Sequence, residues 1–140
     1  MNTPPRITLW FSRIVIAFVI FLFGMISLKN LVDPVKANVI HQITLGSPEA
    51  ITNTRVGLGA FPFGIVIILF ACLISTRRHL SGLIVILAID GAATLTRIYG
   101  IFADGPAVWT LFVLRPEIVI LIITTVAIFF EKRRRAKVIL

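Results

Sequence analysis

The sequence has 140 residues, of which 58% are hydrophobic and only 14% are charged, and its mean hydropathy is +1.02. Water-soluble domains carry about a quarter charged residues, so this composition excludes an ordinary soluble globule and indicates a protein embedded in lipid. The length allows one domain, residues 1–140. The single cysteine, Cys72, excludes an intramolecular disulfide and a multi-cysteine metal site, and we expect it to be a small buried apolar residue.

The formal net charge of +8 comes largely from basic residues that flank apolar segments. Arg77 and Arg78 form one cluster, and a second cluster runs from Lys132 to Lys137. Positive charge beside an apolar segment is a signal of membrane topology. We therefore interpret the charge as an orientation signal and expect no nucleic-acid partner.

The first apolar segment, residues 7–28, predicts the first membrane-spanning helix. Basic residues precede it, as they do in a signal peptide. The apolar stretch is long, however, and no small-residue cleavage site follows it, which favours an uncleaved helix.

The connection that follows predicts a short amphipathic helix in the first outer loop. Asp33 and Pro34 have the residue types of an N-cap and a first helical position. Val35, Val39 and Ile43 then fall on one helical face, which would lie on the membrane surface or cap the bundle.

The second predicted span covers residues 48–75, because Ser47 and Pro48 repeat the start signal ahead of the apolar run. Ala60 and Gly64 lie four residues apart and predict a face for close helix packing. As an alternative, the missing side chains would make room for a ligand beside Arg55.

The third and fourth predicted spans cover residues 80–101 and 107–130, and a basic tail follows at 131–140. Each span has about 20 residues or slightly more, enough to cross about 30 Å of hydrocarbon as a helix. The sequence thus predicts an all-α integral membrane protein, an antiparallel four-helix bundle whose main partner is the lipid bilayer. The basic clusters predict that the protein spans the inner membrane with both termini in the cytoplasm.

Four ionisable residues inside the spans are the candidate ligand-binding residues: Arg55, Arg97, Glu117 and Asp90. Charged groups are costly inside a bilayer, so each needs a partner or a function. One hypothesis is a polar pocket in the outer half that binds a lipid or a small anion, because arginine forks suit carboxylates and phosphates. The other is a structural ion pair between Arg97 and Glu117.

The two residues before Glu117 affect its surroundings in the predicted helix. Arg115 is two residues away and cannot point in the same direction, so we expect it to face away and reach for headgroups. Pro116 removes one helical hydrogen bond and frees the carbonyl of Phe112, which predicts a kink or a local widening.

A recurring set of residues carries a family resemblance. It comprises Arg55 followed by Gly59-Ala60 and Gly64, Arg97 with Asp104-Gly105-Pro106 after it, and Glu117 in a long apolar helix. This pattern resembles the bacterial domain-of-unknown-function family 4345, small four-helix membrane proteins distantly similar to DoxX-like proteins. The resemblance covers nearly the whole chain. It highlights Arg55, Arg97 and Glu117 and implies no activity.

Three functions remain open at this point. The leading hypothesis is a binding protein without a cofactor or a metal, in which Arg55 and Arg97 bind an anion, Glu117 orients Arg97 and Asp90 supports them. The alternative is an accessory subunit that packs against other membrane subunits or against copies of itself. The third is a lipid-modifying or isomerase-type enzyme that uses Glu117 as a proton donor.

Overall fold

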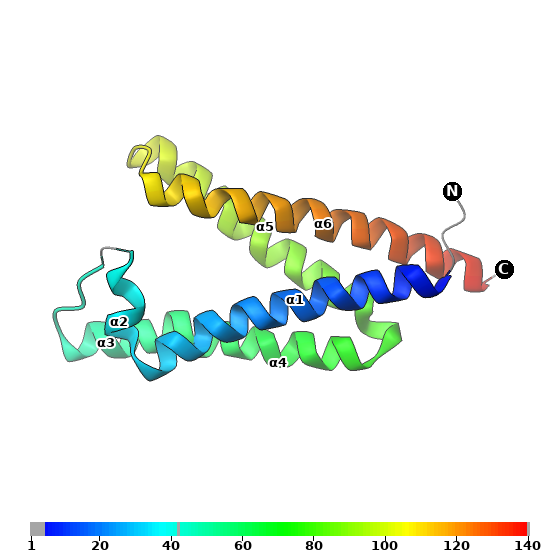
Figure 1. The fold of residues 1–140 in the computed structure, drawn as a ribbon, viewed down its shortest axis with the longest axis horizontal. Helices are drawn as coiled ribbons and strands as arrows, with labels where there is room; N and C mark the ends of the chain where they lie inside the picture. The colour runs from blue at the N-terminus through cyan, green and yellow to red at the C-terminus, as the bar shows by residue number, and fades with distance from the viewer. Residues whose placement is uncertain (1–4, 42, 140) are drawn as a thin grey trace. The chain divides into compact units, whose positions relative to one another are not determined.

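The computed structural model describes residues 5–41 and 43–139, and this part of the chain contains helices and no strand. Within the same residues, four helical segments are long and apolar enough to cross a membrane. They are Arg6–Val32, Pro48–Ile74, Thr76–Ala103 and Val108–Ala136. The predicted fold class, an all-α membrane protein with four spans, is confirmed (Figure 1).

Shorter helical elements accompany the long helices. In chain order the elements are α1 (Pro5–Val32), α2 (Pro34–Val39), α3 (Pro48–Thr54), the π-helix η1 (Arg55–Ala60), α4 (Phe61–Ile74), the 3₁₀-helix η2 (Thr76–Arg78), α5 (His79–Ala103) and α6 (Val108–Ile139). The segments α3, η1 and α4 follow one another without a break and form the second span.

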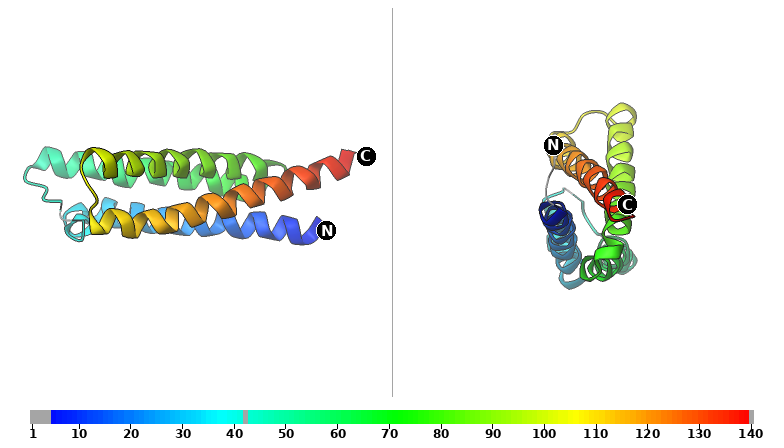
Figure 2. Two further views of the ribbon diagram at one scale, coloured as in Figure 1. Left: turned by 90° about the horizontal axis from the view of Figure 1, so that it is seen from above. Right: turned by 90° about the vertical axis from the view of Figure 1, so that its right-hand side faces the viewer.

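The chain divides into two compact units. Unit 1 consists of Met1–Ile16 and Cys72–Leu140, and unit 2 consists of Ala17–Ala71. Helix α1 therefore contributes its first part to unit 1 and its second part to unit 2, and α6 runs unbroken within unit 1 (Figure 2). The single four-helix domain stays a prediction.

Apolar and polar side chains are distributed as lipid requires. Large apolar residues such as Phe102 and Val108 are 84% and 87% exposed, whereas the hydroxyl residues Ser12, Ser27 and Thr124 are 0% exposed. Large apolar side chains can contact lipid tails without cost, so small and polar residues occupy the helix interfaces, where they pack closely and form hydrogen bonds. This pattern supports the membrane assignment independently of hydropathy.

In unit 2, the predicted start signals are used as helix caps. The Asp33 carboxylate accepts a hydrogen bond of 3.1 Å from the Lys36 amide at the start of α2, and the Ser47 hydroxyl accepts one of 3.1 Å from the Ala50 amide at the start of α3. Proline occupies the first turn of both helices, where its missing N–H costs nothing.

Helix α2 is shorter than the predicted apolar face. It ends at Val39, so Ile43 does not belong to it. The buried side of α2 is polar, because the Asn38 amide donates to the side chain of Asn30 at 2.9 Å and to the Pro34 carbonyl at 2.8 Å. The apolar residues Val35 and Val39 are exposed, as a helix on a membrane surface requires.

The close helix contact in unit 2 lies at Gly59 and not at the predicted pair. A Cβ atom on Gly59 would lie 2.9 Å from side-chain atoms of Leu31, whereas one on Gly64 would meet no atom of the described residues within 4 Å. The hydroxyl of Ser27 also donates to the Gly59 carbonyl at 2.6 Å. A π-turn takes more residues than an α-turn, and this shifts which residue faces α1.

In unit 1, α5 and α6 form an antiparallel hairpin. The connection between them contains Gly105 with φ of +94°, a backbone conformation that glycine adopts without strain. At the opposite end of the hairpin, Gly82 approaches the buried Cys72. A Cβ atom added to Gly82 would lie 2.9 Å from the Cβ of Cys72. The expectation that Cys72 is a small buried residue is thereby confirmed.

Candidate functional site

The ion pair between Arg97 and Glu117 is the centre of the candidate site. The Arg97 Nε donates to one Glu117 oxygen at 2.9 Å and Nη2 donates to the other at 2.8 Å. Two parallel hydrogen bonds of this kind fix the guanidinium in orientation as well as in position. The side chains are 28% and 13% exposed, so the pair is largely removed from its surroundings. The ion pair that was one of the two hypotheses from the sequence is thus present.

Both residues come from the interior of long helices that face each other. Arg97 lies two turns before the end of α5, and Glu117 lies in the third turn of α6. Pro116 precedes Glu117 without interrupting α6, which continues through it to Ile139. Arg115 is exposed, in agreement with the prediction that it faces away from Glu117.

Asp90 belongs to the same face of α5 as Arg97, because seven residues correspond to nearly two full helical turns. It is only 7% exposed. The structure thus pairs Arg97 with Glu117 and places Asp90 two helical turns away on the same face of α5.

A shallow open hollow of ≈ 400 Å³ lies beside Arg97, lined by Ala92, Ala93, Thr96 and Arg97 itself. Arg97 uses Nε and Nη2 on Glu117, and its Nη1 has no hydrogen-bond partner among the described residues. The guanidinium carries five N–H groups, and Glu117 takes two. The remaining donors are available to an acceptor in the hollow.

Arg55, the fourth candidate residue, lies in unit 2 as the first residue of η1, and its side chain is exposed. No ion pair joins it to a carboxylate of the described residues. The Arg97 site, in contrast, lies in unit 1.

A second buried charge cluster escaped the prediction from sequence. Glu131 is 0% exposed and accepts hydrogen bonds from Arg134 at 2.6 Å and 3.0 Å and from Arg135 at 3.3 Å. Arg135 also donates to the carbonyl of Arg77 at 2.6 Å, which ties the end of α6 to η2. These residues were assigned to a basic tail after Phe130. The i, i+3 and i, i+4 spacing of the acid and its two arginines was the available signal that the helix continues.

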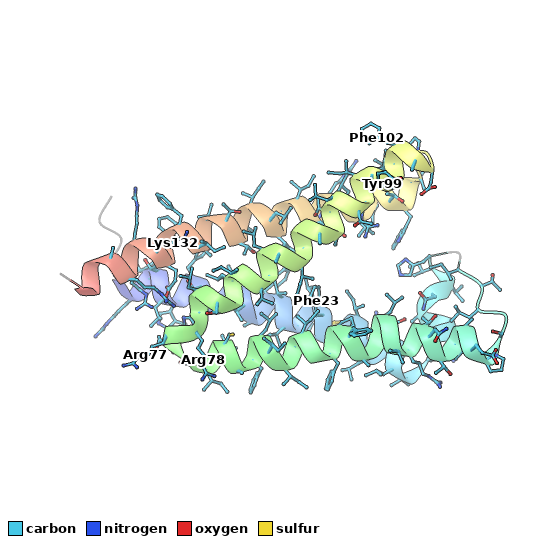
Figure 3. All side chains as sticks on the ribbon, turned by 180° about the vertical axis from the view of Figure 1, so that it is seen from behind. Phe23, Arg77, Arg78, Tyr99, Phe102 and Lys132 are labelled. Atoms are coloured by element: carbon cyan, nitrogen blue, oxygen red, sulfur yellow. The ribbon has the colours of Figure 1, made fainter. Side chains whose placement is uncertain are left out.

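His79 is buried beside this cluster. It is 0% exposed, and its Nε2 lies 3.2 Å from the Leu73 carbonyl oxygen. Like the cluster around Glu131, it lies at the basic end of unit 1, where the exposed residues Arg77, Arg78 and Lys132 gather (Figure 3).

One of the comparisons with known proteins finds a family, and none of them adds an activity. The family described as "Domain of unknown function (DUF4345)" matches residues 11–128. The chain belongs to this family, and the predicted resemblance is confirmed. No curated protein and no solved structure matches the chain.

Proposed function

We propose that this member of the domain-of-unknown-function family 4345 is a membrane protein that binds a lipid headgroup or a small anionic molecule beside Arg97. The observation that carries the proposal is the arginine fork itself. Glu117 holds it in a fixed orientation, its remaining donors have no partner in the described residues, and a hollow adjoins it. A preoriented guanidinium is the group that phosphate and carboxylate ligands prefer.

The charge of Glu117 sets a condition on this binding. It neutralises Arg97, so an incoming anion requires a second positive charge for full compensation. The exposed Arg55, which belongs to unit 2, stays a candidate on the ground of the sequence alone. Asp90 lies two helical turns from Arg97 on the same face of α5 and would support the site from there.

The proposed orientation places this site in the outer half of the inner membrane, with both termini in the cytoplasm. Two features of unit 1 support it. Arg77, Arg78 and Lys132 lie near one end, and the exposed aromatic residues Tyr99 and Phe102 lie near the other end of α5 (Figure 3). Basic residues favour the cytoplasmic side, and aromatic residues favour the interfaces.

The test is native mass spectrometry of the protein extracted gently from its own membrane, together with the variants Arg97→Ala and Arg97→Lys. Arg115→Ala is the matched control, because it removes an exposed arginine two residues from Glu117 and leaves the ion pair intact. We expect a bound lipid or small anion in the wild type and in Arg115→Ala. We expect it to be lost in Arg97→Ala and weakened in Arg97→Lys, which keeps the charge and loses the fork.

Two results would count against the proposal. Equal occupancy in all four proteins would assign Arg97 and Glu117 a purely structural role. A co-purifying polypeptide in place of a small ligand would favour the alternative of an accessory subunit. A Cβ atom on Gly64 would meet no atom of the described residues within 4 Å, and this small-residue position gives that alternative a surface for a partner helix.

A further inference from the structure

Three buried oxygen atoms on α5 and α6 have no hydrogen-bond partner among the described residues. They are Oδ2 of Asp90, Oγ1 of Thr94 and Oγ1 of Thr124. The three residues are 7%, 4% and 0% exposed, respectively. An unpaired buried polar atom costs about 1–3 kcal/mol, so three of them in one region call for a common explanation.

The register of α5 and α6 brings these residues to one level. Near one end of the hairpin Arg97 pairs with Glu117, and near the other end Arg135 reaches the carbonyl of Arg77. Asp90 lies seven residues before Arg97 on α5, and Thr124 lies seven residues after Glu117 on α6. Both therefore lie between these two contacts. Steps of seven preserve the helix face, so Asp90 and Thr124 face each other across the hairpin.

Thr94 joins them from α5. It lies one turn from Asp90, on the side toward Arg97, and side chains four residues apart on a helix are neighbours. All three oxygen atoms therefore converge on the same stretch of the helix interface. None of them is hydrogen-bonded to another. Each of these oxygen atoms therefore retains an unused capacity to accept a ligand.

Charge limits the identity of this ligand. Arg97 is the nearest cation along this face, and Glu117 already neutralises it. An ionised Asp90 deep in a membrane span needs one further positive charge. Oxygen donors suit hard cations, and a single carboxylate balances a monovalent ion, whereas a divalent ion would leave an excess positive charge in the bilayer.

We propose that Asp90, Thr94 and Thr124 form a binding site for a small monovalent metal cation between α5 and α6. The carboxylate of Asp90 supplies the charge, and the two hydroxyl oxygens complete the ligand set together with water. The site lies two helical turns from the proposed anion site at Arg97, and its ligand atoms are not those that would hold the anion.

The test is thermal unfolding of the purified protein in detergent, in lithium, sodium or potassium chloride against choline chloride at equal ionic strength. A ligand that binds only the folded state raises the Tm in proportion to the logarithm of its concentration. We expect such a rise with one of the metal ions and none with choline. Asp90→Asn and Thr124→Val should abolish the rise, because each removes a ligand atom.

Thr125→Val is the matched control. Thr125 is the next residue on α6, it is exposed, and its hydroxyl donates to the Leu121 carbonyl of its own helix. This variant should retain the full ion dependence. A wild-type Tm that is the same in all four salts would overturn the proposal and assign Asp90 a proton in place of a cation. An equal loss of ion dependence in Thr124→Val and Thr125→Val would also overturn it, since only Thr124 faces Asp90.

Discussion

At the scale of single residues, the Arg97–Glu117 pair shows why intramembrane charges are informative. A charged side chain in a bilayer is tolerated where a partner offsets its desolvation. Only a few such residues exist in the predicted spans, and Arg97 and Glu117 have opposite charge. Their pairing was therefore one of the two hypotheses that the sequence supported.

The pair should contribute measurably to stability. We expect Glu117→Gln to lower the free energy of unfolding by about 1–3 kcal/mol, because it weakens two charge-assisted hydrogen bonds to a largely buried guanidinium. Reversible unfolding in mixed micelles measures this change. Arg115→Ala should change it by less than about 0.5 kcal/mol, as exposed sites usually do. The exchanged pair Arg97→Glu with Glu117→Arg should recover part of the loss, and no recovery would contradict a specific pairing.

Gly59 provides a second test at this scale. Gly59→Ala should destabilise the protein by about 1–3 kcal/mol, because the added Cβ would lie 2.9 Å from side-chain atoms of Leu31 and 3.3 Å from its backbone nitrogen. Gly64→Ala should be neutral or stabilising by about 0.5–1 kcal/mol, since alanine favours a helix and the position is open. The same unfolding assay compares the two. The reverse order would show that the Ala60–Gly64 face is the packed one.

At the scale of elements, the sequence predicted those features that depend on composition and on local signals. The four spans follow from apolar length, and the two caps follow from Asp33-Pro34 and Ser47-Pro48. The π-helix η1 could not be predicted, because it depends on tertiary contacts such as the hydrogen bond from Ser27. The buried position of Glu131 was missed for a related reason, since only the packed end of α6 removes it from solvent.

The grouping of Asp90, Thr94 and Thr124 was also beyond prediction from the sequence. Threonine is common in membrane helices, and only the register between α5 and α6 distinguishes Thr124 from Thr125. The structure fixes this register through contacts at both ends of the hairpin.

Helix α2 should depend on pH through its cap. The Lys36 amide donates to the Asp33 carboxylate, and this holds the pKa of Asp33 below its ordinary value. A lowered pKa means that the carboxylate stabilises α2 above its unfolded pKa, about 3.9, and that this stabilisation is lost as the pH falls through the folded value. Relative to the intrinsic rate of an unstructured chain, hydrogen exchange of the α2 amides should therefore accelerate in acid.

Asp33→Asn separates the cap from its charge. Asparagine also caps helices well, so exchange in α2 should become independent of pH in this variant after correction for the intrinsic rate. Asp33→Ala should give fast exchange at every pH. A pH dependence that survives in Asp33→Asn would assign the effect to another group.

At the scale of the whole molecule, the proposed topology makes a prediction about accessibility. In a Cys72→Ala background, single cysteines at Thr44 and Asp104 should react with a membrane-impermeant maleimide added to spheroplasts. A cysteine at Lys132 should react only after the membrane is opened. All three positions are exposed, so burial does not confound the comparison. Labelling of Lys132→Cys in intact spheroplasts would contradict the cytoplasmic placement of the basic residues.

The division of the chain into two units has a consequence for biosynthesis. Unit 2 is one continuous stretch, Ala17–Ala71, and it can form its internal contacts while the ribosome is still making the second half of the protein. Unit 1 combines the two ends of the chain, so its first helical turns must wait in the membrane for α5 and α6. The hydrogen bond from Arg135 to Arg77 forms only after the polar turns that follow the last apolar segment have been translated. Insertion of the last span is therefore not the step that completes unit 1.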